Sequence, residues 1–220
     1  MTPRSRILTF CSAVALVLLI PRAALSQQGK KADHNGDPYY LPNCPITGEK
    51  LGGMGEPFIK VYDGREVRFC CPKCPAKFEK DLAGNFAKID DQMIKDQLPL
   101  YPLKTSVVSG KNLSEKPLDF IWANRLIRVL DNSEKDRFLK DPDRYTKDLD
   151  KAVIAQQGKD YPVNSCVVSN EKFGKETGKP RDVVLAGRLI RLCCNNCKKD
   201  LAKTPETFVA RVDAAREPKK

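Results

Sequence analysis

Alternating apolar and polar residues occur in three stretches of the chain, and a two-residue turn interrupts each stretch. In the first stretch this alternation predicts strands over residues 58–62 and 65–70, joined at Asp63-Gly64. Asp-Gly between alternating apolar residues is a strong hairpin signal because both turn positions favour positive φ. The same pattern predicts two further hairpins, with strands at 120–122 and 125–130 and at 183–185 and 188–193.

Apolar residues at helical spacing follow each predicted hairpin. After a short helix, Phe86, Ile89 and Met93 lie on one face of a second predicted helix. Asp141-Pro142 and Thr204-Pro205 have the order of an N-cap and a first-turn proline, which predicts where the second helix begins in the later stretches. We assign the other apolar residues of these helices to the core as well, namely Phe78, Leu82, Phe138, Tyr145, Leu149, Val153, Leu201, Phe208 and Val212.

These elements belong to a unit of about 60 residues that occurs three times. Leu-Ile-Arg-Val at 126–129 matches Leu-Ile-Arg-Leu at 189–192, and both match Val-Arg-Phe at 67–69. A core of this size is marginal and often needs a staple. We predict an α+β fold of three tandem small modules, each a loop, a β-hairpin and two short helices, at residues 38–97, 98–157 and 158–217.

The first 26 residues have the layout of a secretory signal peptide. Arg4 and Arg6 precede an apolar run at 7–20, and Ala23-Ala24-Leu25-Ser26 ends the segment. We predict cleavage after Ser26, a flexible linker at 27–37 that contains the sole histidine, His34, and a mature protein that is periplasmic or secreted. No later stretch is apolar enough to span a membrane, so no span is expected after signal cleavage.

Charge is distributed evenly along the predicted mature chain. Without the signal peptide, 36 basic and 28 acidic residues remain, a net charge of about +8. Lysines are interspersed with Asp and Glu along the predicted helices and form no basic block with aromatic residues. This distribution is typical of a solvated surface and argues against a nucleic-acid partner.

Cysteines form the same pattern in the first and third units, where one loop cysteine is followed 26 or 27 positions later by Cys-Cys-x-x-Cys. Thiolates select soft or borderline ions, chiefly Zn(II) and Cu(I). Three would leave a Zn(II) site open or suit trigonal Cu(I), and a fourth would close a tetrahedral Zn(II) site. Adjacent residues at a strand end point in opposite directions, so both cysteines of a Cys-Cys pair can bind one ion only if the chain turns sharply there. We therefore predict that Cys71 and Cys194 are either fourth ligands or transfer thiols. The primary predicted ligand sets are Cys44, Cys70 and Cys74, and Cys166, Cys193 and Cys197.

The middle unit contains no cysteine and serves as an internal control. Alignment places Ser106 at the loop position, and Leu130, Asp131 and Glu134 at the positions of Cys-Cys-x-x-Cys. The apolar positions are retained, so we expect this unit to fold without the cysteines. That expectation argues against a purely structural staple in the outer units.

Two other interpretations of the cysteines stay open. The predicted mature chain has eight cysteines, an even number that fits a disulfide framework in an envelope interaction scaffold whose middle unit carries the partner surface. Cys71-Pro72-Lys73-Cys74 would suit a thiol–disulfide oxidoreductase, although the βαβ context of that motif is missing. No histidine lies near the cysteines and no catalytic group follows from the spacing, so we expect a protein that is not an enzyme.

The cysteine pattern and the residues after it resemble the TRASH and YHS domains, which are small treble-clef-like modules implicated in binding, sensing or trafficking heavy metals. Phe-Cys-Cys-Pro-Lys-Cys-Pro-Ala-Lys-Phe at 69–78 and Leu-Cys-Cys-Asn-Asn-Cys at 192–197 carry the resemblance, and Phe-Leu-Lys-Asp-Pro-Asp-Arg-Tyr at 138–145 keeps only the family's tail. The resemblance implies three tandem treble-clef-like modules. Together with the predicted export, it leads us to expect an envelope protein that sequesters or delivers Zn(II) or Cu(I), or that confers tolerance to these ions. We also expect a second envelope protein as a partner.

Overall fold

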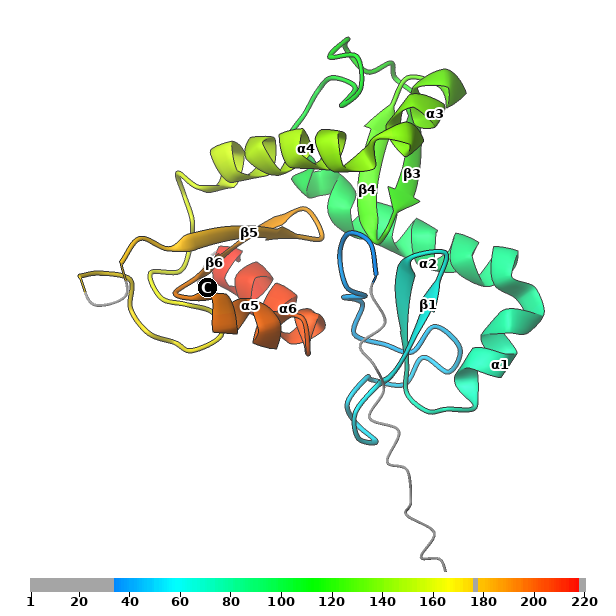
Figure 1. Cartoon of the computed structure of the whole chain (residues 1–220), viewed down its shortest axis with the longest axis horizontal. Coiled ribbons are helices and arrows are strands. Elements are labelled where there is room, and N and C mark those ends of the chain that lie inside the picture. Colours follow the sequence, from blue (N-terminus) through cyan, green and yellow to red (C-terminus); the bar gives the residue numbers. More distant parts are fainter. Residues whose placement is uncertain (1–33, 176–177, 218–220) are drawn as a thin grey trace, which may run out of the picture. The chain divides into compact units, whose positions relative to one another are not determined.

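Three antiparallel β-hairpins, each followed by helices, make up the computed structural model of the chain (Figure 1). The structure describes residues 34–175 and 178–217, which belong to one compact unit, Ala32–Lys220. The predicted signal peptide at 1–26 and the first part of the predicted linker lie outside the described residues. Helices and antiparallel strands occur together, which confirms the α+β class.

The elements follow the same order in each third of the described chain. In the first unit, β1 (Phe58–Tyr62) and β2 (Arg65–Phe69) precede α1 (Cys74–Phe78), a 3-10 turn at Glu79–Asp81 and α2 (Leu82–Gln97). After a second 3-10 turn at Leu98–Leu100, the second unit contains β3 (Leu118–Trp122), β4 (Arg125–Val129), α3 (Asn132–Lys140) and α4 (Pro142–Gln157). The third unit contains β5 (Arg181–Leu185), β6 (Arg188–Leu192), α5 (Asn195–Leu201) and α6 (Pro205–Arg216).

Each hairpin turns through two residues with positive φ, as type I′ turns require. Asp63 and Gly64 have φ values of 48° and 80°, and the turns at 123–124 and 186–187 repeat this sign. The second strand of each hairpin ends one residue before the predicted end, so Cys70 and Cys193 lie just beyond β2 and β6. The register beside the turn is also repeated, with pairs Tyr62 and Arg65, Trp122 and Arg125, and Leu185 and Arg188.

The two predicted helix starts agree with the structure, whereas one core assignment, that of Leu82, does not. The Asp141 carboxylate accepts a hydrogen bond from the backbone N–H of Arg144, which confirms the predicted N-cap of α4. Thr204 begins α6 without a side-chain cap bond. Leu82, predicted in the core of the first short helix, instead begins α2 and is 41 % exposed, because a 3-10 turn intervenes after Phe78. None of the described helices is long and apolar enough to cross a membrane.

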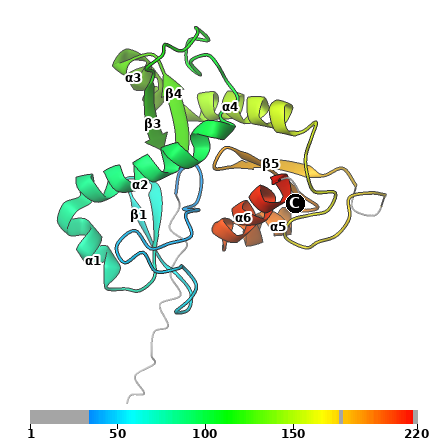
Figure 2. The same ribbon diagram turned by 180° about the vertical axis from the view of Figure 1, so that it is seen from behind.

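Residues 34–37 pack among the tips of the three hairpins (Figures 1 and 2), which differs from the flexible linker predicted for 27–37. The backbone N–H of Asn35 donates to the carbonyl of Gly64 at 2.7 Å, and the N–H of Asp37 donates to the carbonyl of Ala123 at 3.0 Å. The Asp37 carboxylate accepts a bond from the N–H of Ala186 at 2.7 Å. One short segment therefore binds all three turns.

The side chains of this segment are satisfied by groups far away in the sequence. Asp37 is 6 % exposed and accepts two hydrogen bonds, of 2.7 and 2.8 Å, from the guanidinium of Arg125. His34 lies 3.3 Å from the Glu66 carboxylate and not beside a cysteine group. The polar sequence of residues 34–37 predicted a flexible linker, because partners that lie far away in the sequence leave no local pattern.

Two glutamines join consecutive units. Gln97 ends α2, donates to the carbonyl of Asn124 and accepts from the N–H of Leu126. Gln157 ends α4 and makes the same pair of bonds to Gly187 and Leu189. The second helices of the first two units, α2 and α4, thus end on the turn of the next hairpin.

The apolar cores are divided unequally between the units. The middle unit has a core of its own around Ile127, Val129, Phe138 and Leu149. Most buried apolar residues of the first and third units form one cluster, and the cysteines of both outer units lie in it or against it. Val184 and Leu189 of the third unit pack instead with Val153 of α4. The two cysteine groups therefore share a single core.

Candidate metal centre

Cys44 lies in a tight loop that recurs in every unit. Its backbone N–H donates to the carbonyl of Glu49 at 2.8 Å, and its carbonyl accepts from the N–H of Gly48 at 2.9 Å. Gly48 has a φ of 74°, a left-handed conformation that glycine adopts without a steric penalty. Cys166 closes the same loop in the third unit, where Asn170 takes the left-handed position with a φ of 62°. Both loop cysteines are buried, at 2 % and 0 % exposure.

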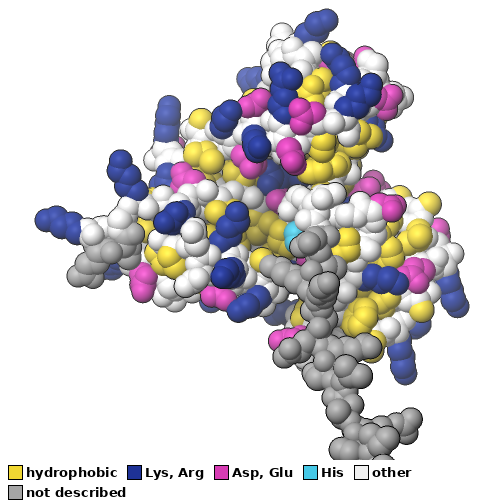
Figure 3. All heavy atoms as spheres, viewed as in Figure 1, with side chains coloured by type: hydrophobic (Ala, Val, Ile, Leu, Met, Phe, Trp, Pro, Cys, Tyr) yellow, Lys and Arg dark blue, Asp and Glu magenta, His cyan; other side chains and the backbone are white. Residues whose placement is uncertain are grey.

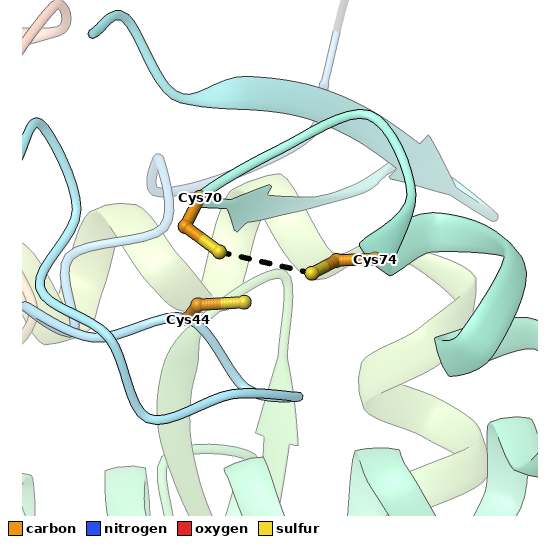
Figure 4. A group of neighbouring side chains, drawn as sticks. All are labelled: Cys44, Cys70 and Cys74. Atoms are coloured by element: carbon orange, nitrogen blue, oxygen red, sulfur yellow. Dashed lines mark hydrogen bonds between the residues drawn. The ribbon is translucent and has the colours of Figure 1, made fainter. Parts of the chain in front are cut away.

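Strand β2 and helix α1 supply the other two cysteines of the first group. Cys70 follows β2, and Cys74 is the first residue of α1. The sulfur atoms of Cys44, Cys70 and Cys74 lie within 4.8 Å of one another and point toward a common centre (Figure 4). The Sγ atoms of Cys70 and Cys74 are 3.7 Å apart.

The third unit builds the same group from Cys166, Cys193 and Cys197. Their sulfur atoms also lie within 4.8 Å of one another, and those of Cys193 and Cys197 are 3.5 Å apart. Both predicted sets of three cysteines are therefore brought together by the fold.

The spacing and chemistry of the sulfurs suit a soft metal ion. A Zn–S bond of about 2.3 Å places two sulfurs of a tetrahedral site about 3.8 Å apart, close to the separations in both groups. Each group consists of sulfur donors alone among the described residues. Such a set favours Zn(II) or Cu(I) over Mg(II) or Ca(II), which prefer oxygen.

A hydroxyl group that the sequence analysis did not identify lies against each sulfur group. Thr47 Oγ1 is 3.3 Å from Cys70 Sγ, and Ser169 Oγ is 3.4 Å from Cys193 Sγ. Both residues come three positions after the loop cysteine, and Ser109 has this place in the middle unit. Comparison of the three loops could have revealed this shared hydroxyl position.

Burial and hydrogen bonds separate the pKa values of the thiols. Burial raises the pKa of Cys44, but the Thr47 hydroxyl and nearby backbone N–H groups outweigh it and lower that pKa to about 7. The pKa of Cys166 is lowered to about 7 by the same balance, with Ser169 as the donor. Burial, followed by bonds with neighbouring cysteines, raises the pKa of Cys74 and Cys197 far above the usual value. Each group therefore favours one thiolate beside protonated thiols.

Cys71 and Cys194 lie at the edge of the two groups. The Sγ of Cys71 is 3.5 Å from that of Cys74, and the Sγ of Cys194 is 3.6 Å from that of Cys197. Neither belongs to the set of three sulfurs that all lie within 4.8 Å. Both are partly exposed, and backbone N–H groups of the following residues lower the pKa of each.

In the middle unit a carboxylate takes the place of the sulfurs. The Glu134 carboxylate accepts hydrogen bonds from the Ser106 hydroxyl and from the N–H of Leu130. Burial raises the pKa of Glu134, but the hydroxyls of Ser106 and Ser109 outweigh it and lower that pKa. The positions aligned with Cys44, Cys70 and Cys74 thus satisfy one another through hydrogen bonds.

No family model matches the chain, and neither a curated protein nor a solved structure matches it. The geometry of the two cysteine groups is therefore the main guide to function.

Proposed function

We propose that this chain is an exported protein that binds Zn(II) or Cu(I) through two groups of cysteine thiolates and serves metal sequestration, delivery or tolerance. The convergence of three sulfurs within 4.8 Å in each outer unit carries the proposal. The ligands are Cys44, Cys70 and Cys74 in the first unit and their three counterparts in the third. Binding, and not catalysis, is the proposed activity.

The number of converging sulfurs favours a metal ion over a disulfide. A disulfide joins two sulfurs, whereas one ion engages all three atoms of the set. The middle unit adds support, because it forms the same loop, hairpin and helices with Ser106 and Glu134 in place of cysteines. The fold of a unit does not depend on sulfur, so the cysteines are available for binding.

We also propose that the units are tandem treble-clef-like modules of the TRASH or YHS type, with the middle copy lacking its site. The shared order of loop, hairpin and two helices supports this assignment. Each loop is also closed by an isolated β-bridge at the same place, Asn43 with Lys50, Thr105 with Asn112 and Ser165 with Lys172.

The proposal includes export to the periplasm or the medium, because the segment at 1–26 resembles a secretory signal peptide. A second envelope protein would then donate or receive the ion, and nucleic acid is not a partner. Basic and acidic side chains are intermixed over the face in Figure 3, in keeping with a solvated surface.

Metal analysis with free-thiol counting tests the proposal. Wild-type protein isolated without oxygen is expected to hold about two equivalents of Zn or Cu. The double variant Cys44→Ser and Cys166→Ser is expected to lose most of that metal because each site loses one of three ligands. Ser106→Ala, at the matching position of the middle unit, is the control and should retain the wild-type content.

Other outcomes would point to the competing functions. Protein without metal and without free thiols would make the cysteines disulfide staples of a scaffold. Turnover of a disulfide substrate with reversible oxidation of Cys71 and Cys74 would make the protein an oxidoreductase.

A further inference from the structure

The middle unit shows which residue suits the position of Cys71 and Cys194 when no sulfur group is present. Asp131 takes that position, and its carboxylate accepts a hydrogen bond of 3.0 Å from the N–H of Glu134 at the start of α3. Aspartate is among the best residues for this capping role. Where stability alone decides, the fold therefore uses a helix cap.

The third unit has a thiol in place of this cap. Cys194 is the residue before α5, with φ −152° and ψ 171°, nearly the backbone of Asp131 at φ −159° and ψ 179°. Its side chain makes no cap hydrogen bond. In the first unit the residue before α1 is Lys73, so Cys71 does not have the capping position there. A capping role therefore does not account for sulfur at either position.

The position of the thiol relative to the sulfur groups suggests its role. Cys44 and Cys74 are 2 % and 1 % exposed, whereas Cys70 and Cys71 are both partly exposed. Of these two, only Cys71 lies outside the set of three converging sulfurs. The 3.5 Å between the sulfurs of Cys71 and Cys74 is close to the spacing of about 3.8 Å that two sulfurs adopt on one Zn(II) ion. A single ion can therefore contact the outer thiol and an inner ligand at the same time. Cys194 and Cys197, at 3.6 Å, repeat this arrangement.

We propose that Cys71 and Cys194 are exchange thiols, through which the metal ion enters and leaves the two groups of three sulfurs. The inference rests on the proposed metal binding and adds to it a route of transfer. In the inward direction the ion forms a bond to Cys71 Sγ while its bond to a donor thiolate breaks. The ion then bonds to Cys74 Sγ and to the other two ligands, and the bond to Cys71 breaks.

Protons balance this exchange, and no electrons are transferred. Each protein thiol that becomes a ligand releases its proton to water, and each donor thiolate that departs takes one up. When the ion leaves the protein, the same steps run in reverse. The donor and the acceptor are molecules that themselves present thiolates.

Replacing both exchange thiols with the residue of the middle unit tests the proposal. The double variant Cys71→Asp and Cys194→Asp replaces each thiol with the residue that the middle unit has at this position, and a Cys71→Ser and Cys194→Ser variant removes the thiol without adding a carboxylate. Metal content and equilibrium affinity are expected to match the wild type in both variants. Transfer of Zn(II) to a pyridylazo chelator, or of Cu(I) to bathocuproine disulfonate, is expected to slow roughly tenfold or more.

Asp131→Ser is the matched control, because it introduces serine at the same position of the unit that has no cysteines. Its transfer rate should equal that of the wild type.

Wild-type transfer rates in both double variants would overturn the proposal. So would lower metal content, or fewer sulfurs around the ion by X-ray absorption, since Cys71 and Cys194 would then be resident ligands. Wild-type protein that binds no metal would instead refute the proposed function, before any variant is compared.

Discussion

At the scale of single residues, the loop cysteines differ in charge from their partners. Hydrogen bonds from Thr47 and backbone N–H groups favour a thiolate at Cys44, while burial keeps Cys74 protonated. Cys166 and Cys197 repeat this contrast. Above pH 7 a metal-free group of three sulfurs therefore carries about one negative charge, and an incoming cation must displace the remaining protons.

Metal binding is therefore expected to release protons and to weaken as pH falls. At pH 8 Cys44, with a pKa of about 7, is mostly thiolate, whereas the raised pKa values of Cys70 and Cys74 keep those thiols protonated. Each ion should then release about two protons, and about three below pH 7, where Cys44 is protonated too. The apparent affinity should fall with decreasing pH, and more steeply below 7.

Isothermal titration in buffers of different ionisation enthalpy measures this release. The double variant Cys44→Ser and Cys166→Ser, which is expected to bind little metal, is the blank for heat and proton release that do not come from the two sites. A proton count that stays the same from pH 6 to 8 would contradict the assignment of the first thiolate to the loop cysteine.

At the scale of elements, one arrangement of loop, hairpin and helix start supports two kinds of centre. In the outer units the loop and the helix present sulfurs, and in the middle unit Ser106 and Glu134 bind each other. The backbone is prepared in both cases by the same loop bonds, since Ser106 N–H donates to the Lys111 carbonyl as Cys44 N–H does to Glu49. Side-chain chemistry, and not backbone geometry, distinguishes the units.

Restoring the cysteines of the middle unit is therefore expected to create a third metal site. The triple variant Ser106→Cys, Leu130→Cys and Glu134→Cys should raise the bound metal from about two to about three equivalents. Elemental analysis of protein loaded without oxygen measures the content. Ser106→Cys alone is the control, because one thiol beside Glu134 provides too few soft ligands.

A folded triple variant that still binds the wild-type amount of metal would show that the middle unit lacks the geometry of a site. Circular dichroism establishes that the variant is folded.

At the scale of the whole molecule, Arg68 joins the first unit to the third. It is 1 % exposed and donates to the carbonyls of Ala202 and Lys203 beyond the end of α5, and to the Glu66 carboxylate. The matching arginines bind a carboxylate within their own hairpins, Arg128 to Asp119 at 2.8 Å and Arg191 to Asp182 at 3.1 Å, and Arg191 also donates to the carbonyl of Gly158. The strand partner of Arg68 is Ile59, which offers no carboxylate, so the guanidinium binds across the interface.

Arg68→Met is expected to lower the free energy of unfolding by about 3–5 kcal/mol, because Glu66 loses its guanidinium partner and the carbonyls of Ala202 and Lys203 lose their donor. Arg128→Met removes a partly exposed pair and should cost about 1 kcal/mol. Urea unfolding at fixed metal content measures both variants. Equal losses in the two variants would show that the bonds of Arg68 across the interface contribute no more than a pair within one hairpin.

Local patterns explain what could be predicted. The turn at Asp63-Gly64 and the cap at Asp141 depend on neighbouring residues, so the hairpins and the start of α4 follow from short segments. The two sets of three cysteines were predictable because the spacing is repeated. The prediction that Leu82 belongs to the core of the first short helix was wrong, because an apolar residue at helical spacing does not reveal that a 3-10 turn interrupts the helix.

Short stretches of sequence are enough to predict the α+β class, the three hairpins, the loop positions of Cys44 and Cys166, and the absence of sulfur from the middle unit. These features depend on turn residues, alternation and spacing, which act over a few positions. Three other features became visible only in the folded chain: residues 34–37 bind all three turns, Arg68 joins two units, and Cys71 lies at the edge of its sulfur group. Each of these depends on partners or packing from remote segments, because a buried charge or backbone group must find its hydrogen bonds wherever the folded chain supplies them.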